Sequence, residues 1–286
     1  MSEFIIVTDS SCDVAEKVLA DWNVHCVQLD VLVDGEENRK NNEIEPHAFY
    51  EKLRGGKMAR TSAANITTFR EVFEPLLKEG KDVLYLGFSS GLSTTYQSAT
   101  IAAEELKEEY ADRVVLTVDT LAASLGQGLL VYLAVEQKKQ GASIAEVAAY
   151  VQQLVPQLAL WFTVDDLNHL KRGGRISGAV ALVGTMLGIK PVLHMDKEGH
   201  LINMSKSRGR LAAITALADK YGETVTDMAA PVFISHGDCL EDAQTLAAML
   251  DEKYGVKVQM IDFVGPVIGA HSGPGTLALF FLATAK

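Results

Sequence analysis

Hydrophobic and polar residues follow two alternating patterns through the first half of the chain. Short apolar runs at 4–9, 82–88 and 113–119, and an alternating segment at 26–35, are typical of strands. Helical spacing of apolar residues follows at 13–22, 45–56, 67–79, 93–109, 123–139 and 144–154. Strands that alternate with helices of this length form parallel βαβ units whose sheet is covered on both faces. The first half is therefore predicted to be a Rossmann-like α/β domain.

The second half has a different pattern, which introduces antiparallel pairing. Two strand-like segments within 191–204 are separated by Lys197-Glu198-Gly199, a sequence typical of a tight turn. Helices are expected at 207–221 and 240–254, and strands at 231–237, 256–263 and 276–284. We therefore predict an α+β domain with a mixed or antiparallel sheet.

A domain boundary is expected near Pro156, which ends a helix. The predicted domains are residues 1–156 and 157–286. A cleft between two such domains is the natural place for a ligand.

Composition and charge exclude several classes of protein. The formal net charge is −11 and no Lys/Arg stripe occurs, which argues against a nucleic-acid-binding protein. No segment has the uninterrupted apolar length of a membrane span, and the first residues lack the basic region of a signal peptide. The three cysteines are widely spaced and fit reduced thiols. We expect a cytoplasmic protein without a metal site or a cofactor, because no motif for either occurs.

Hydroxyl side chains collect where the predicted parallel strands end. The stretch LGFSSGLSTTYQSA (86–99) carries five of them within seven positions, Ser89, Ser90, Ser93, Thr94 and Thr95. Ligands of open parallel sheets bind at this edge, and one N-cap hydroxyl explains one residue, not five. Hydroxyls around a helix N-terminus favour an anion. Because the lysine of a phosphate-binding loop is missing, a carboxylate is the better prediction.

Two further segments leave alternatives open. Ser93 with His271 as its base would make a serine hydrolase or acyltransferase, although the GxSxG motif is absent. The segment LKRGGRIS (170–177) is either a solvated turn or a second, basic site. The apolar segment 178–189 after it belongs either to the core or to the wall of an apolar ligand site.

Seven segments together resemble the DegV family of bacterial lipid-binding proteins, in the order in which the family has them. They are IVTDSSCDV, RTSAAN (60–65), FSSGLSTTYQSA (88–99), TVDT, FTVDDLNHLKRGGRIS (162–177), LGIKPVLHMDKEGHL and IGAHSGPGTLALFF (268–281). The resemblance implies a two-domain, DegV-like fold with one long-chain fatty acid between the domains. Its carboxylate would be held by hydroxyls, and its tail would be enclosed by apolar residues.

The resemblance also assigns roles to individual residues. It implies carboxylate binding by Thr61, Ser62, Ser93, Thr94 and His271. In family members of the kinase-subunit type, a separate ATP-dependent fatty acid kinase phosphorylates the bound acid to an acyl phosphate for phospholipid synthesis, and Arg172 and Arg175 look like the residues that would face the phosphate or the kinase. This chain departs from the family pattern in two places. Thr94 replaces the usual glycine and Ala64 replaces the usual proline.

Overall fold

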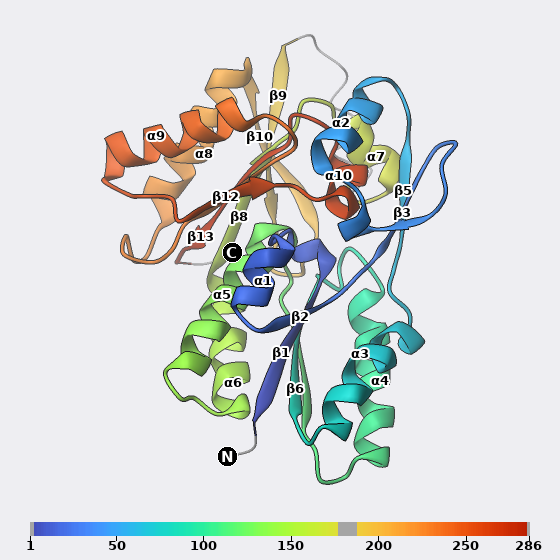
Figure 1. Ribbon diagram of the computed structural model, residues 1–286. Helices are drawn as coiled ribbons and strands as arrows, with labels where there is room; N and C mark the ends of the chain where they lie inside the picture. The colour runs from blue at the N-terminus through green and yellow to red at the C-terminus, as the bar shows by residue number, and fades with distance from the viewer. Residues whose placement is uncertain (1–2, 177–187, 285–286) are drawn as a thin grey trace.

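The computed structural model describes residues 3–176 and 188–284 and shows an α/β fold (Figure 1). Its first sheet has four parallel strands in the order β2–β1–β6–β7, with bounds β2 Val24–Val27, β1 Phe4–Asp9, β6 Asp82–Gly87 and β7 Val115–Asp119. Every residue of β1 and β6 is buried, as expected of a sheet covered on both faces. The predicted parallel sheet is confirmed.

The second sheet is mixed, as predicted. Its order is β10–β9–β8–β13–β11–β12, and only the β11–β12 pair is parallel. Its strands are β8 Leu158–Thr163, β9 Ile189–Met195, β10 Leu201–Arg208, β11 Phe233–His236, β12 Met260–Phe263 and β13 Leu277–Leu282. The tight turn between β9 and β10 lies where the sequence predicted it, and Gly199 takes a positive φ of 78° there.

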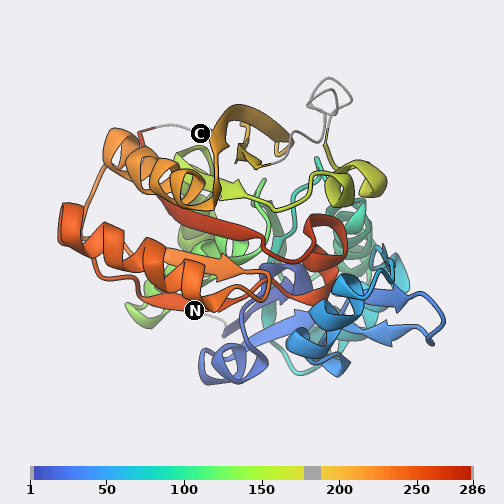
Figure 2. The ribbon, with the colours of Figure 1, turned by 90° about the horizontal axis from the view of Figure 1, so that it is seen from above.

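Helices form layers on both sides of the two sheets. Helix α5 (Leu125–Lys139) contacts strands of both sheets, and Leu129 of this helix shares one apolar core with Leu160 and Phe280. Helices α3 (Ile66–Lys78) and α4 (Thr95–Glu109) cover the other face of the parallel sheet, and α6 (Ile144–Leu154) packs beside α5. Helices α8 (Arg210–Thr224) and α9 (Leu240–Tyr254) lie side by side on the mixed sheet (Figure 2).

A third, three-stranded antiparallel sheet corrects two predictions. The segment 26–35 is not one strand, because β2 joins the parallel sheet and β3 (Asp30–Val33) joins the third sheet in the order β4–β3–β5. The chain changes direction between them, where the Leu29 N–H donates to Ser10 Oγ over 3.0 Å. Strands β4 (Arg39–Lys40) and β5 (Ala59–Ser62) complete this sheet. The sequence predicts a connecting loop before a helix for Thr61 and Ser62, and the structure places both residues on β5 instead.

Several helix boundaries also differ from the sequence-based expectation. Helix α1 (Glu16–Asp21) begins after Asp13, whose φ of 56° no helix accepts. Helix α2 spans Pro46–Arg54, and short 3₁₀ turns occupy Ser10–Cys12, Asn41–Glu43 and Val155–Gln157. Helices α7 (Asn168–Gly173) and α10 (Pro266–Ser272) were not predicted. The apolar segment 178–189 lies almost wholly outside the described residues, and the domain boundary at 156 stays a prediction.

Candidate functional site

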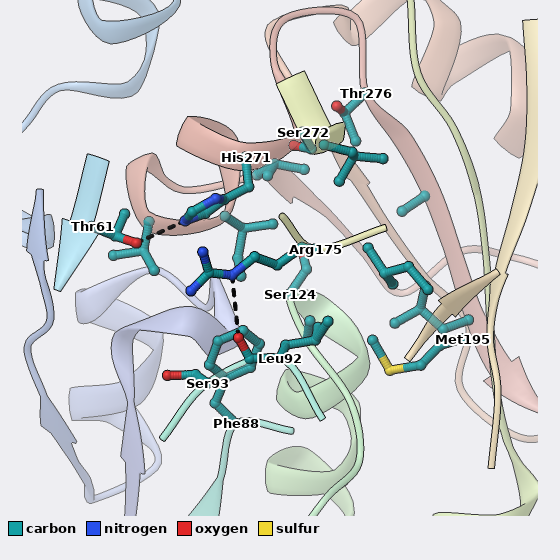
Figure 3. A pocket seen from close by; sticks show the side chains of 18 of the residues that line it. Thr61, Phe88, Leu92, Ser93, Ser124, Arg175, Met195, His271, Ser272 and Thr276 are labelled. Atoms are coloured by element: carbon teal, nitrogen blue, oxygen red, sulfur yellow. Dashed lines mark hydrogen bonds between the residues drawn. The ribbon is translucent and has the colours of Figure 1, made fainter. Parts of the chain in front are cut away.

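A cavity of about 380 Å³ lies between the inner face of the mixed sheet and the carboxyl ends of the parallel strands (Figure 3). Loops after β6 and β7 form one side of the cavity, and residues of helix α10 form another part of its wall. Its volume is typical of a small-molecule site. Most of its wall is apolar, including Leu160, Phe162, Met195, Leu201, Ala278 and Phe280 from the mixed sheet.

Polar residues from four separate elements meet at one end of this cavity. All five residues implied to bind a carboxylate line it, together with Arg175. They come from β5, from the loop before α4, from the segment after α7 and from α10: Thr61, Ser62, Ser93, Thr94, Arg175 and His271. The fold therefore brings together residues that lie more than 200 positions apart in the sequence.

Thr61 and His271 are in direct contact at this end of the cavity. Thr61 Oγ1 lies 2.7 Å from His271 Nε2 in a hydrogen bond (Figure 3). Burial, and then the positive charge of Arg175, lower the pKa of His271 to about 4. The imidazole is thus neutral near pH 7, when it can either donate or accept one hydrogen bond through Nε2.

The Nδ1 edge of the His271 ring, on the opposite side from the bond to Thr61, is packed against Gly173. A side-chain carbon at Gly173 would come closer than 3.0 Å to His271 Nδ1, so only glycine leaves the ring in this position. Gly174, the next residue, ends α7 in the left-handed region with a φ of 67° and has open space around it. Glycine is therefore favoured at the two positions for different physical reasons, which are space for the His271 ring at Gly173 and a positive φ at Gly174.

Arg175 gives the polar end of the cavity its charge. Its Nε donates to the carbonyl of Leu92 over 3.3 Å, and its Nη1 donates to the carbonyl of Gly173 over 2.6 Å. Among the residues of 3–176 and 188–284 that line the cavity, Arg175 is the one with a full charge. In a chain with a net charge of −11, a cavity with one cation and no carboxylate in its described wall favours an anionic group.

Ser93 and His271 make their hydrogen bonds to different partners. Ser93 Oγ lies 2.8 Å from Thr95 Oγ1 and accepts the Thr95 N–H, while His271 bonds Thr61. Thr94 is exposed at the N-cap of α4. A nucleophile activated by a base requires a direct hydrogen bond between the two side chains. The geometry therefore does not form a Ser93–His271 catalytic pair, and it places the hydroxyls in the cavity wall, where they can bind an anion.

A second cavity, of about 470 Å³, adjoins the first one at the Thr61–His271 pair. Thr61, Arg175 and His271 line both cavities, whereas Arg60 and Arg172 line only the second. Arg172 is exposed and its Nη2 lies 3.2 Å from His169 Nδ1. Arg172 is therefore separate from the first cavity, and Arg175 belongs to both.

Sequence analysis missed several residues of the two cavities. Arg60 and His169 line the second cavity, and Ser235 and Ser272 line the first. Ser124, one of the hydroxyls that the sequence places around the end of the strand at 113–119, lines the first cavity as well. Arg60 precedes Thr61 on a strand that has no apolar alternation, so its position gave no signal. The serines come from three elements that become neighbours only in the folded chain.

The described ranges contain neither a metal site nor a membrane-spanning helix. No group of His, Cys, Asp and Glu side chains there is placed to hold a metal ion. No helix there is long and apolar enough to cross a membrane.

Comparisons with known proteins agree with one another. The family model described as "Uncharacterised protein, DegV family" matches residues 3–284. A DegV domain-containing protein of Clostridium perfringens is 46% identical over 289 residues, which cover 100% of this chain and 99% of that protein. A DegV lipid-binding protein of Thermotoga maritima has a TM-score of 0.86 at 30% identity, with 100% of both chains covered. A fatty-acid-binding DegV family protein of Thermus thermophilus has a TM-score of 0.86 at 31% identity and coverage of 98% and 99%.

Proposed function

The chain belongs to the DegV family, and from this premise we propose that it binds one long-chain fatty acid in the cavity between its two sheets. The observation that carries the proposal is the distribution of charge in the cavity wall. Arg175 and the hydroxyls of Thr61 and Ser93 lie at one end, and the remaining wall is mostly apolar. A carboxylate with a long hydrocarbon tail matches both parts.

The head group would be held by charge-assisted hydrogen bonds. Hydroxyls of Thr61, Ser62, Ser93 and Thr94 can donate to a carboxylate oxygen, and the Arg175 guanidinium supplies the counter-charge. Neutral His271 holds Thr61 in the rotamer that faces the cavity. The protein would act as a carrier in the cytoplasm, without turnover and without a cofactor.

We further propose that the carrier presents this carboxylate to a separate ATP-dependent fatty acid kinase, which forms the acyl phosphate used in phospholipid synthesis. The second cavity supports this part, because it adjoins the head-group residues and is lined by Arg60, Arg172 and Arg175. Phosphoryl transfer to a carboxylate develops negative charge, which a guanidinium can pair in bidentate fashion.

A titration of the delipidated protein tests the binding proposal. We expect saturable binding of one stearate per chain by calorimetry, and much weaker binding of methyl stearate, which has the same tail and no charge. Equal binding of the acid and the ester would contradict a carboxylate site. Release of methanol from the ester would indicate the hydrolase alternative instead.

Arg172 and Arg175 separate the two parts of the proposal. Arg172→Ala should leave stearate affinity unchanged, because Arg172 lies outside the first cavity, and should slow acyl phosphate formation with a purified fatty acid kinase. Arg175→Ala should lower both. If Arg172→Ala lost its lipid and left the kinase reaction of the remaining bound acid unchanged, the assignment of Arg172 to the kinase encounter would be wrong.

A further inference from the structure

One buried hydroxyl in the described part of the wall of the first cavity has no hydrogen-bond partner. Ser272 ends α10, directly after His271, and is 5% exposed. Its Oγ has no hydrogen-bond partner among the residues that the structure describes. A buried hydroxyl left unpaired is unfavourable, so native structures seldom leave one without a partner. A plain hydrocarbon chain in this cavity cannot supply that partner.

A second polar point lies in the same wall. Ser235 is fully buried, and its Oγ lies 2.9 Å from the Oγ of Ser124, which donates in turn to the buried Asp13 carboxyl. A hydroxyl has one donor and two acceptor positions, so Ser235 keeps acceptor capacity after this contact. The hydrogen bond to Asp13 gives the Ser124 hydroxyl a partner within the protein. It does not explain Ser272.

Ser272 follows His271 directly, so the first polar point lies beside the head-group end. In Figure 3, Ser272 lies next to His271 on the side away from Thr61, and Ser124, the hydrogen-bond partner of Ser235, lies between the Thr61–His271 pair and Met195. An acyl chain whose carboxylate lies at the Thr61–His271 pair would therefore begin close to Ser272. Leu160 and Phe280 line the same cavity, so a polar substituent on the chain would otherwise enter apolar surroundings.

We propose that the cavity prefers a fatty acid with a hydroxyl on its chain, placed where the hydroxyl pairs with Ser272. This inference rests on the proposed fatty-acid binding and adds the chemical class of the acid. The Ser272 hydroxyl donates to the oxygen of the ligand hydroxyl or accepts its hydrogen. An ordered water on Ser272 is the competing explanation, and it predicts no preference for the hydroxylated acid.

The test compares stearic acid with its 2-, 3-, 10- and 12-hydroxy derivatives on the wild-type protein by competition with a fluorescent fatty acid. At least one hydroxy acid should bind roughly five- to hundredfold tighter than stearate, the range that pairing one buried hydroxyl provides. If stearate binds and none of the four binds more tightly, the proposal is overturned while the fatty-acid site stands. If none of the five acids binds, the proposed function itself fails.

Ser272→Ala assigns the preference to this side chain. The variant should lose the advantage of the favoured hydroxy acid and should bind plain stearate at least as well as wild type, because no hydroxyl is left unpaired. Ser90→Ala is the matched control, since Ser90 also lines the cavity but is exposed, so water can satisfy its hydroxyl. An advantage that survives in Ser272→Ala, or disappears in Ser90→Ala, would refute the role of Ser272.

Discussion

Substituting the two glycines of the basic segment separates steric positioning of the head-group site from stability of the fold. Gly173→Ala places a methyl group closer than 3.0 Å to His271 Nδ1, although the backbone of Gly173 needs no positive φ. The ring must move, and its 2.7 Å hydrogen bond with Thr61 is lost or lengthened. If this pair orders the carboxylate donors, losing one donor to a charged group costs about 1.5–3 kcal/mol. Stearate should then bind roughly ten- to hundredfold more weakly.

The effect of Gly173→Ala on stability should be small. Alanine is better than glycine in a helix by about 0.5–1 kcal/mol, which offsets part of the repacking cost of about 1–3 kcal/mol. Gly174→Ala is the matched control, because Gly174 has a φ of 67° and nothing within 4 Å. That variant should lose about 1–2 kcal/mol of unfolding free energy from the left-handed backbone and should keep its stearate affinity.

Urea unfolding and calorimetric titration of the delipidated proteins measure the two quantities separately. The two variants should differ in opposite ways, with weaker stearate binding in Gly173→Ala and lower stability in Gly174→Ala. Wild-type affinity in Gly173→Ala would show that the His271 position does not control the head-group site. Equal loss of affinity in both variants would show that the whole segment, and not the ring contact, matters.

Three further substitutions, one of them with a matched control, test other parts of the structure. Ser93→Ala should weaken stearate binding by roughly tenfold or more and cost at most about 1 kcal/mol of stability, and unchanged calorimetric affinity would remove Ser93 from the site. Burial raises the pKa of Asp13 well above its usual value, so the stability that the protonated carboxyl gives is present at acid pH and is lost as the pH rises through the folded-state pKa. Asp13→Asn should therefore gain stability relative to wild type between pH 5 and 8 in urea titrations, and a constant difference would contradict this assignment. Gly199→Ala would bring a methyl group onto Ser89 Oγ, whereas Gly35→Ala has a similar φ of 77° and open space. The first should cost about 1–3 kcal/mol more than the second, and equal losses would mean that the β9–β10 turn is not packed tightly on Ser89.

The pattern of apolar residues and turn residues predicted the central strands and the hairpin of the fold. Buried apolar runs identified β1 and β6, and the Lys197-Glu198-Gly199 turn identified the β9–β10 hairpin. Strand β5 escaped prediction because it has no apolar alternation and exists through pairing with β3 and packing against α10. Helix α10 contains Gly269, a poor helix former, which is needed because a side-chain carbon there would collide with Tyr50. Tertiary contacts decided both elements.

In the candidate site, too, the sequence predicted some features, and tertiary contacts decided the others. Hydroxyl clustering and the family resemblance named Thr61, Ser93 and His271, and the structure brings them to one cavity. The sequence placed Arg172 and Arg175 together, but only Arg175 reaches that cavity, because the chain turns at Gly174. Spacing along one chain carries no information on such a difference in direction.

The most direct test of the central claim is to identify what the purified protein carries. Native mass spectrometry should give the mass of the chain with one non-covalent ligand, and extraction with organic solvent should release one equivalent of a fatty acid with a free carboxyl group. The hydroxylated or unsubstituted nature of the chain would be determined from the same extract. A protein that carries no lipid and binds none when stearate is added, or an acyl group bound covalently to Ser93, would contradict the carrier function.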